Sequence, residues 1–373
     1  MELKILTVLG ARPQFIKAAP VSRAIAEHNR KAPETFCIKE VIVHTGQHYD
    51  HNMSRIFFEE MDIPEPHINL GVGSGPHGKQ TGEMLIRMEE VLETEKPDWV
   101  LVYGDTNSTL AGALAAVKLH RPVAHVEAGL RSYNREMPEE HNRVLTDHCA
   151  DLLLCPSQRA VNNLKREAVD RGVHLVGDTM YDAVLQFSEI AKGRSNILEK
   201  LGLHSKEYYL TTVHRPYNSD NPKNLAEILQ SFLELEKPVV FPIHPRTHQK
   251  MLDSGLSSNL PPPTSILRTI PPVGYLDMLV LEQNARMILT DSGGMQKEAY
   301  FLGVPCVTLR PETEWVETVE AGWNVLTGAN RDEIVNAVTG YRLPDTHPPL
   351  YGDGAAAQKI LRTLLNYAYR TDS

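Results

Sequence analysis

The sequence predicts an α/β fold made of two doubly wound domains, each built on a parallel sheet. Short apolar runs rich in β-branched residues alternate with longer helical patterns along almost the whole chain, which is typical of βαβ units. These runs form two groups of about six. The length of 373 residues is too great for one ordinary domain and suits two.

The first group of strands is expected at 3–9, 38–44, 98–103, 122–126, 151–155 and 173–176, and the second at 207–213, 238–243, 265–268, 286–290, 304–308 and 323–326. A helical pattern at 178–191 and a polar stretch at 192–196 separate the groups. We therefore expect one domain at 1–175, joined by a C-terminal helix at about 355–373, and another at 176–354. Two such domains facing each other would direct the carboxyl ends of both sheets toward a central cleft that closes on a ligand.

The composition excludes several classes of protein. With 42% hydrophobic and 23% charged residues the chain is neither disordered, collagen-like nor membrane-embedded. The net charge of −9 provides no general attraction for nucleic acid or anionic membranes, so any phosphate must be bound locally. The sixteen histidines are a mild excess of the side chain that titrates near neutral pH.

The four cysteines form no C-x-x-C pair, which argues against a disulfide framework or a zinc site and favours a reducing, cytoplasmic location. The apolar stretch at 5–9 has no basic region before it and no small-residue cleavage site after it, so we interpret it as a first strand. The sequence contains no apolar run of 18 residues, which excludes a membrane-spanning helix.

The first strand leads into a candidate anion site. Gly10 permits a tight turn, while Arg12 and Lys17 lie on or near a helix N-terminus that already attracts anions. A basic residue that is merely exposed at this turn would explain Arg12 equally well. The chain lacks G-x-G-x-x-G, which disfavours NAD binding.

Acidic residues follow two successive strands of the first half, Asp105 and Glu127. Helix capping in the segment 106–109 would also account for Asp105. Further along, Pro138 opens a helix with Glu139 and Glu140 in its first turn, where carboxylates are favourable without any function. We expect Glu140 to be structural, whereas Glu139 could point into the cleft.

In the second half, a strand ends in His214 and Arg215, a titratable group and a fixed cation that suit a diphosphate leaving group. His244 and Arg246 form a similar basic corner, which an exposed helix start would also explain. Arg310 stands at a further polar strand end.

A glycine-rich turn forms the strongest single segment of the second half. Ser292, Gly293 and Gly294 follow a strand and would expose backbone N–H groups at a helix N-terminus, which favours phosphate binding. Glu298 lies about one and a half turns further on, within reach of a ribose diol. Gly-Gly turns are also common without any ligand.

Six motifs in this order resemble the non-hydrolysing UDP-N-acetylglucosamine 2-epimerase family. They are Gly-Ala-Arg-Pro-Gln-Phe-Ile-Lys at 10–17, Gly-Asp-Thr-Asn-Ser-Thr at 104–109, His-Val-Glu-Ala-Gly-Leu-Arg at 125–131, Pro-Glu-Glu-His-Asn-Arg at 138–143, Val-His-Arg at 213–215 and Thr-Asp-Ser-Gly-Gly-Met-Gln-Lys-Glu-Ala at 290–299. The resemblance spans nearly the entire chain.

This resemblance implies two Rossmann-like domains in a GT-B-like arrangement. It also implies that UDP-N-acetylglucosamine and UDP-N-acetylmannosamine are interconverted for surface polysaccharide biosynthesis, through elimination of UDP to a 2-acetamidoglycal and its re-addition. Inverting C2 requires acid/base groups on both faces of the sugar. The resemblance further implies a homodimer and neither a metal nor a redox cofactor.

Motif by motif, Asp105, Glu127 and Glu139 match the family's acid/base carboxylates, and His214 matches the group beside the diphosphate. Which carboxylate serves which face is open. We expect the substrate to be bound by Arg12, Lys17, His214, Arg215, Ser292, Gly293, Gly294, Glu298 and Arg310.

Three segments depart from the best-known branch of the family: Thr-Glu-Trp-Val-Glu at 313–317, Gln-Phe at 14–15, and the loop at 73–82. They resemble a branch that acts on UDP-2,3-diacetamido uronic acids, so the substituents at C3 and C6 stay open. Residues 47–48 match a segment that binds a second, regulatory UDP-N-acetylglucosamine in some members, but residues 49–51 alter it, and we do not expect that regulation.

Three alternatives compete with this interpretation. A hydrolysing 2-epimerase would release the free sugar. A GT-B glycosyltransferase would share the fold and nucleotide turn without requiring three carboxylates in the first domain. A sensor that binds without turnover should have lost some of Asp105, Glu127, Glu139 and His214, all of which are present.

Overall fold

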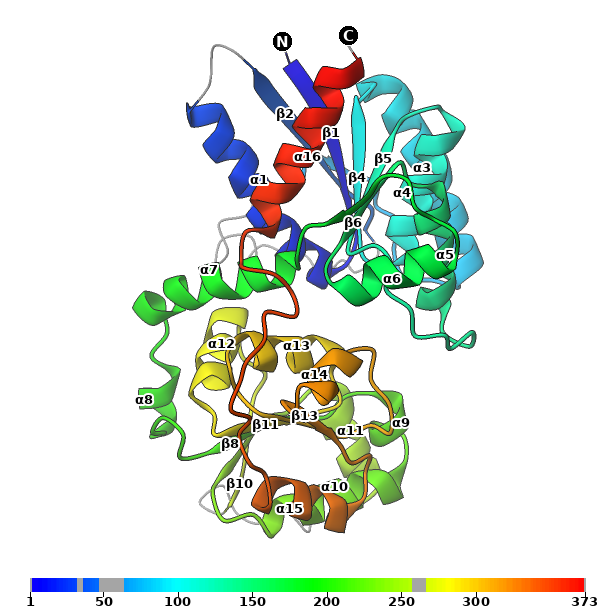
Figure 1. Ribbon diagram of the computed structural model, residues 1–373. Helices are drawn as coiled ribbons and strands as arrows, with labels where there is room; N and C mark the ends of the chain where they lie inside the picture. The colour runs from blue at the N-terminus through cyan, green and yellow to red at the C-terminus, as the bar shows by residue number, and fades with distance from the viewer. Residues whose placement is uncertain (1, 32–35, 47–63, 257–265, 372–373) are drawn as a thin grey trace. The chain divides into compact units, whose positions relative to one another are not determined.

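The computed structural model describes residues 2–31, 36–46, 64–256 and 266–371 (Figure 1). The chain divides into two compact units, one of residues 1–186 with 351–373 and one of residues 187–350. The division falls inside helix α7 (Thr179–Arg194). Residues 47–51, which bear on the expected absence of a second, regulatory nucleotide-sugar site, lie outside the described residues.

Within the described residues, the first unit contains a parallel sheet of order β3-β2-β1-β4-β5-β6-β7. Its strands are β1 (Glu2–Leu9), β2 (Cys37–His44), β3 (Ile68–Asn69), β4 (Trp99–Tyr103), β5 (Val123–Val126), β6 (Leu152–Cys155) and β7 (Val173–Leu175). The strand order reverses between β1 and β4, and ligands of such sheets bind beyond the carboxyl ends of the strands at this switch point.

Helices cover both faces of this sheet, as a parallel sheet requires. They are α1 (Arg12–Lys31), α3 (His77–Glu95), α4 (Asn107–Lys118), α5 (Pro138–Cys149), α6 (Gln158–Arg166), α7 and α16 (Ala356–Thr371). Helices α3 and α4 pack together over a core that includes Val8, Met88 and Val102, while α1 packs with α16 (Figure 1). The segment 73–82, expected as a loop, is irregular only over 73–76, because its residues from His77 on form the first turns of α3.

Helix α16 returns the chain to the first unit. The Asp178 amide donates to the Tyr351 carbonyl over 2.9 Å, and the Asp182 carboxylate accepts from the amides of Ala356 and Ala357 at 3.1 and 2.8 Å. Burial raises the pKa of Asp182 to about 6 although these amides favour the carboxylate. Helix α16 packs on α1, and its residue Ile360 is fully buried.

The second unit, within its described part, contains a parallel sheet of order β10-β9-β8-β11-β12-β13. The strands are β8 (Tyr209–Thr212), β9 (Val239–Pro242), β10 (Leu267–Ile270), β11 (Met287–Thr290), β12 (Cys306–Thr308) and β13 (Asn324–Leu326). Its order reverses between β8 and β11. The helices are α8 (Ile197–Leu201), α9 (Pro216–Ser219), α10 (Pro222–Leu233), α11 (Pro245–Asp253), α12 (Tyr275–Asn284), α13 (Gly293–Phe301), α14 (Val316–Glu320) and α15 (Arg331–Thr339).

Two cores hold the second unit together. Phe232 of α10, Met251 of α11 and Ile334 of α15 pack on one side with Phe241 and Leu289 of the sheet. Residues of α8, α12 and α13 form the other core with the opposite faces of β8, β9, β11 and β12. The predicted α/β fold with two doubly wound sheets is therefore confirmed.

Candidate functional site

Gly104, which follows β4, brings two of the predicted residues together. Its φ is +63°, and a Cβ added to it would lie 3.3 Å from Glu127 Oε2 and 3.5 Å from Lys17 Nζ. The Lys17 ammonium donates a hydrogen bond to Glu127 Oε2. The carboxyl ends of β4 and β5 and the first turns of α1 thus meet at a small patch, where a Cβ at position 104 would crowd Glu127 Oε2 and the positive φ favours glycine.

Glu127 adopts the left-handed backbone region, with a φ of +70°. This conformation costs a residue with a side chain about 1–2 kcal/mol. It is held by the Glu127 amide, which donates to the Leu154 carbonyl at the end of β6 over 3.1 Å. Strained backbone of this kind clusters at functional sites, so the observation supports a function for Glu127.

Asp105 is held by a cation and does not cap a helix. Arg143 Nη2 donates to Asp105 Oδ2 over 2.6 Å, and Arg143 Nη1 donates to Glu140 Oε2 over 3.0 Å. The cap of α4 is Thr106, whose hydroxyl accepts from the Thr109 amide. The capping explanation of Asp105 is therefore wrong, and its carboxylate remains about one-third exposed at the sheet edge.

The contacts of Glu140 agree with the structural role that we expected from its position in the first turn of α5. Its carboxylate accepts from the amides of Ser132 and Tyr133, each at 2.9 Å, and from the Ser132 hydroxyl at 2.8 Å. Burial alone would raise the pKa of Glu140, but these hydrogen bonds and the charge of Arg143 outweigh it and hold the pKa below its ordinary value. Glu140 therefore orders the loop before α5 and orients Arg143.

Two other predicted residues are exposed. Arg12 is the first residue of α1, and Glu139 lies in the first turn of α5. Glu139 makes no hydrogen bond or ion pair with any residue that the structure describes. The structure therefore joins Lys17 to Glu127 and Arg143 to Asp105, but it does not bring Glu139 into contact with either group.

Gln14, which departs from the best-known branch of the family, holds two of the turns beside these residues. It is buried, and its Oε1 accepts from the amides of Gly10 and Ala11 at 2.8 and 3.0 Å. Its amide group donates to the Tyr103 carbonyl at 2.7 Å and to Thr109 Oγ1 at 3.0 Å. One side chain thus joins the turns that follow β1 and β4. An ionised glutamate could accept the first two bonds but could not donate the others.

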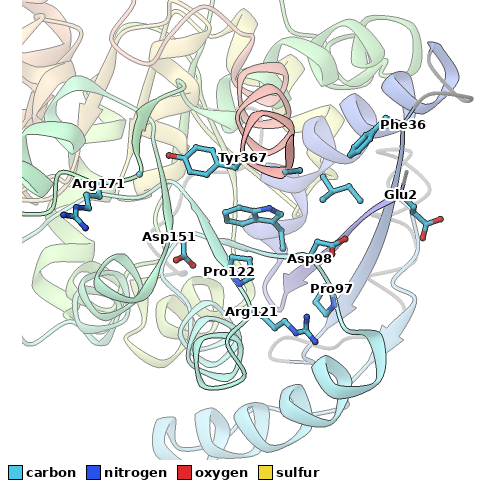
Figure 2. Close-up of a pocket in the computed structure, with 13 residues that line it drawn as sticks. Glu2, Phe36, Pro97, Asp98, Arg121, Pro122, Asp151, Arg171 and Tyr367 are labelled. Carbon is cyan, nitrogen blue, oxygen red and sulfur yellow. The ribbon is translucent and has the colours of Figure 1, made fainter. Parts of the chain in front are cut away.

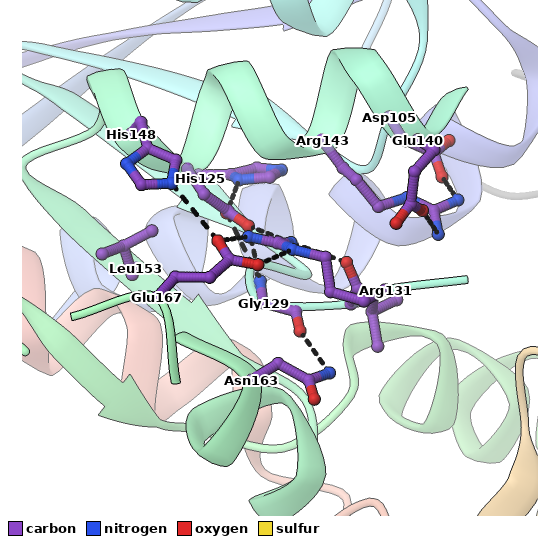
Figure 3. Close-up of polar contacts among 12 residues, drawn as sticks. Asp105, His125, Gly129, Arg131, Glu140, Arg143, His148, Leu153, Asn163 and Glu167 are labelled. Atoms are coloured by element: carbon purple, nitrogen blue, oxygen red, sulfur yellow. Dashed lines mark hydrogen bonds and ion pairs between the residues drawn. The ribbon is translucent and has the colours of Figure 1, made fainter. Parts of the chain in front are cut away.

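Behind this edge, a chain of hydrogen-bonded side chains runs from His125 through Arg131 to the partly exposed Glu167 (Figure 3). The His125 ring lies 2.7 Å from the Gly104 carbonyl oxygen through Nε2 and 2.7 Å from Asp147 Oδ1 through Nδ1. Asp147 Oδ2 accepts from Arg131 Nη1 at 2.6 Å. Arg131 also donates two hydrogen bonds of 2.7 Å to Glu167. The sequence singled out none of these four side chains as site residues, because contacts so distant in sequence leave no local pattern.

In the second unit, Asp291 organises the turn that follows β8. This fully buried carboxylate accepts from the amides of His214 and Arg215, both at 3.0 Å, and from Asn218 Nδ2 at 3.1 Å. It lies at the end of β11, so the two strands at the switch point are joined through it. The predicted pair of His214 and Arg215 is therefore held at the carboxyl edge of the sheet.

The pKa of the His214 imidazole is lowered, which favours the neutral form of the ring. Burial lowers its pKa, and the positive charges of Arg215 and His244 lower it further, whereas Asp291 opposes the shift. The His214 Nδ1 atom lies 3.6 Å from Asp291 Oδ1. His244 caps α11 by accepting from the Arg246 amide, which confirms the helix-start explanation of that corner.

The turn at Ser292, Gly293 and Gly294 forms the N-terminus of α13. The Ser292 hydroxyl accepts from the Met295 amide. A Cβ on Gly293 would lie 3.5 Å from Trp315 Nε1, an ordinary contact, so close packing within the described residues does not require glycine there. Gly293 is buried, and a Cβ there would also lie 3.6 Å from Glu314 Oε2, whereas Gly294 is exposed.

Glu298 lies within α13 and Arg310 follows β12, and both side chains already have bonding partners. The Tyr275 hydroxyl donates to Glu298 Oε1 over 3.0 Å, and Arg310 Nη1 lies 3.2 Å from Glu314 Oε2. Beside them, Lys297 Nζ lies 4.2 Å from the ring centre of Trp315, within the segment that departs from the best-known branch.

A cavity of about 740 Å³ lies at the amino ends of the strands of the first unit (Figure 2). Two of its acidic residues accept hydrogen bonds from strand amides: Asp98 accepts from the Lys4 amide at 2.7 Å and Asp151 from the Val123 amide at 2.8 Å. The cavity therefore lies at the opposite edge from Asp105 and Glu127 and contains none of the predicted site residues.

Among the described side chains, no group of three or more histidine, cysteine, aspartate and glutamate residues is placed to hold a metal ion. None of the helices in the described ranges combines the length and apolar character needed to cross a membrane.

Comparison with known proteins gives matches over the whole chain. A family model described as UDP-N-acetylglucosamine 2-epimerase matches residues 31–365. A Methanococcus maripaludis protein named as a UDP-N-acetylglucosamine 2-epimerase homolog is 51% identical over 366 residues, which cover 98% of this chain and 100% of that protein. The UDP-2,3-diacetamido-2,3-dideoxy-D-glucuronate 2-epimerase of Pseudomonas aeruginosa is 49% identical over 97% of this chain and 99% of its own.

A solved structure is similar over the same extent. It is the UDP-GlcNAc 2-epimerase of Methanocaldococcus jannaschii in complex with UDP-GlcNAc and UDP, which is 45% identical, with a TM-score of 0.84. The match covers 98% of this chain and 100% of that one.

Proposed function

Because the chain belongs to the UDP-N-acetylglucosamine 2-epimerase family and is an isomerase, we propose that it interconverts UDP-N-acetylglucosamine and UDP-N-acetylmannosamine without net hydrolysis. One observation supports this proposal most strongly: two carboxylates lie at the same sheet edge, each paired with a cation. Asp105 pairs with Arg143, and Glu127 pairs with Lys17. Reaction at two faces of a sugar requires two such groups.

The reaction proceeds by elimination and re-addition. A carboxylate removes the C2 proton, the electron pair of the C2–H bond forms the C1–C2 double bond, and the C1–O bond breaks with its electrons passing to UDP. UDP then attacks C1 of the 2-acetamidoglycal while a second group delivers a proton to the opposite face of C2. Asp105 and Glu127 are proposed for these two transfers, with Glu139 as a third candidate.

The second unit offers groups for the departing UDP. Arg215 supplies a fixed charge, His214 a hydrogen bond or a proton, and the N-terminus of α13 an anion-binding end. Glu298, at the second turn of α13, is proposed to accept from the ribose hydroxyls. We also assign Arg12 and Arg310 to substrate binding.

The test is incubation of the protein with UDP-N-acetylglucosamine in D2O, followed by proton NMR. We expect loss of the C2 proton signal and the appearance of UDP-N-acetylmannosamine. Free N-acetylmannosamine formed together with UDP would show a hydrolysing enzyme, and transfer to an acceptor would show a glycosyltransferase. Absence of C2 exchange would overturn the proposed substrate.

A second substrate is favoured by two observations. The relative that is 49% identical is named for UDP-2,3-diacetamido-2,3-dideoxy-D-glucuronate, and the segment 313–317 with Trp315 departs from the best-known branch. The same D2O experiment with that nucleotide sugar decides between them. C2 exchange with the uronate alone would assign the chain to this second activity.

We further propose, from the family resemblance, that the protein acts as a homodimer in the cytoplasm and supplies nucleotide sugars for surface polysaccharides. Sedimentation equilibrium tests the dimer. A monomer at enzyme-assay concentrations that retains full activity would contradict it.

A further inference from the structure

A carboxylate lies beside the N-terminus of α13, the helix end to which we assign the diphosphate. A Cβ added to Gly293, the first residue of α13, would lie 3.6 Å from Glu314 Oε2. Glu314 belongs to the irregular segment between β12 and α14, and its side chain is only 18% exposed. An acidic side chain of the protein is thus placed where an anionic ligand would also be attracted.

Glu314 is paired with an arginine that we assign to substrate binding. Arg310 Nη1 lies 3.2 Å from Glu314 Oε2 and 3.4 Å from Oε1, and Arg310 Nη2 lies 3.4 Å from Oε1. Burial on its own would raise the pKa of Glu314. The charge of Arg310, hydrogen bonds and the charge of Arg215 outweigh burial and hold the pKa below its ordinary value. Glu314 is therefore ionised at neutral pH.

The bond between Arg310 and Glu314 is long for a charged pair. Hydrogen bonds from a guanidinium to a carboxylate are usually about 2.7–2.9 Å long, whereas the shortest of these contacts is 3.2 Å. In the first unit, by contrast, Arg143 donates to Asp105 over 2.6 Å. The Arg310 guanidinium can therefore turn toward another anion at a smaller loss than Arg143 could.

The backbone on both sides of Glu314 is fixed. The Thr313 hydroxyl donates to Gln296 of α13 over 2.5 Å and accepts from the Trp315 amide at 3.1 Å. The Thr318 hydroxyl donates to the Trp315 carbonyl over 2.7 Å. The segment is thus tied to α13 and α14, so a ligand at this helix end meets the Glu314 carboxylate unless a side chain rotates.

The fixed charges at this edge of the second unit cancel. Arg215 and Arg310 are positive, while Asp291 and Glu314 are negative. These four side chains offer a diphosphate no net positive charge as long as Glu314 is ionised. Removing the charge of Glu314 alone would leave one net positive charge for the ligand.

We propose that Glu314 competes with the diphosphate for Arg310 at the N-terminus of α13 and thereby selects the nucleotide sugar over free UDP. The terminal phosphate of free UDP ionises a second time near pH 6, so UDP carries more negative charge than the diphosphate of a nucleotide sugar. Glu314 therefore repels free UDP more strongly. The inference rests on the proposed function for the identity of the ligand.

The same repulsion acts during the proposed reaction. Cleavage of the C1–O bond leaves its electron pair on UDP, which raises the negative charge near Glu314. Attack of that oxygen on C1 of the glycal removes the charge again. Glu314 thus disfavours the state with separated UDP and favours its re-addition over retention of UDP on the protein.

The first test is calorimetric titration of the full-length protein with UDP. We expect Glu314→Gln to lower the Kd roughly 5- to 50-fold, because it removes a like charge from a partly buried site. Glu312→Gln is the matched control, since Glu312 is exposed in the same segment and solvent screens its charge. Its Kd should change less than about twofold. An unchanged or higher Kd in Glu314→Gln would overturn the proposal, and a higher one would show that Glu314 orients Arg310 for the ligand.

Glu314→Ala guards against an effect of the new amide. It also lacks the carboxylate, so it should bind UDP more tightly than the wild type, with urea unfolding to establish that each variant is folded. Weaker binding by a folded Glu314→Ala protein would count against competition.

The second test asks whether the competition is for Arg310. Arg310→Ala should weaken UDP binding more in the Glu314→Gln background than in the wild type, because the guanidinium is then no longer held by the carboxylate. Additive effects of the two substitutions would show that they do not compete.

The third measurement is selectivity. The ratio of the Ki for UDP to the KM for the nucleotide sugar should fall about threefold or more in Glu314→Gln, and an unchanged ratio would overturn the selection of nucleotide sugar over UDP. The proposed function is tested separately. If Glu314→Gln binds UDP more tightly but the wild type exchanges the C2 proton of neither nucleotide sugar, the proposed reaction fails and the competition stands.

Discussion

Arg143 Nη2 donates to Asp105 Oδ2 over 2.6 Å, although the two residues lie 38 positions apart and on different elements. The arginine is itself oriented by Glu140, which is bonded to the loop before α5. Asp105 is thus fixed through two buried partners while its carboxylate remains partly exposed. A carboxylate held in this way can exchange protons with a ligand without changing its own position.

Asp105→Asn should therefore lose turnover and retain binding. The amide can still accept from Arg143 but cannot transfer a proton. We expect kcat to fall by about 10²- to 10⁴-fold, the contribution of a general acid or base. The Kd for UDP, measured by calorimetry, should change less than about twofold. Glu127→Gln should behave alike, and a large loss of UDP affinity in either variant would contradict the assignment.

Glu139→Gln tests the third proposed carboxylate, which is exposed in α5. If Glu139 transfers a proton, kcat should fall by about 10²-fold or more, with UDP affinity unchanged. Glu136→Gln is the control, since that residue is exposed on the loop just before α5. Equal activity in the two variants would remove Glu139 from the reaction.

Gly104→Ala should disturb the site directly. The new methyl group would lie 3.3 Å from Glu127 Oε2, and the φ of +63° disfavours alanine by about 1–2 kcal/mol. We expect lower stability in urea and a marked fall in kcat. Gly82→Ala is the matched control: it lies inside α3 with nothing within 4 Å of the new atom, and should stabilise the protein by about 0.5–1 kcal/mol. An active Gly104→Ala enzyme would contradict the role of this turn.

His214 predicts a link between protonation, stability and UDP binding. Burial is the largest cause of its lowered pKa, so the folded protein binds fewer protons than the unfolded chain just below the ordinary value of about 6.5. The contribution of His214 to stability should therefore be lost as the pH falls from about 6.5 through the folded-state pKa. A bound diphosphate favours the imidazolium, so UDP binding near pH 6 should take up protons.

Calorimetry in buffers of different ionisation enthalpy measures this uptake. His214→Gln should abolish it while the turn around Asp291 stays intact, because Asp291 accepts from the backbone amide of residue 214. Identical proton uptake in His214→Gln and the wild type would show that another group responds to UDP.

Arg12→Ala should weaken diphosphate binding. A charged hydrogen bond to phosphate contributes about 1.5–3 kcal/mol, so the Kd for UDP should rise by about 10- to 100-fold. Arg30→Ala, at the other end of α1 and also exposed, is the control and should leave the Kd unchanged. Equal affinity in both variants would remove Arg12 from the substrate site.

Much of the fold followed from the sequence because parallel strands buried on both faces consist of nearly continuous apolar residues. All twelve expected strands have counterparts in the structure, with ends shifted by one or two residues. Strand β3 was not predicted, since its two residues, Ile68 and Asn69, are too few to form a pattern. The strand expected at 265–268 is found at Leu267–Ile270.

The site was predictable only where residues follow strand ends. Asp105, Glu127 and His214 were identified because the ends of parallel strands gather at one edge. The hydrogen bonds of Gln14, His125 and Asp147 beside these residues were not predicted, because only the fold brings their partners close. The distance between Gln14 and Tyr103 in the sequence is 89 positions, and no local periodicity relates them.

Because α16 belongs to the first unit, that unit cannot finish folding until the end of the chain has been synthesised. Residues 178 and 351 are hydrogen-bonded neighbours, so the whole second unit is inserted between two adjacent points of the first. Helix α16 packs on α1, and its Ile360 and Leu364 are fully buried. On the ribosome, the second unit can therefore fold completely before the first. The first unit emerges earlier, but the face of α1 that packs on α16 stays exposed until the last helix is synthesised.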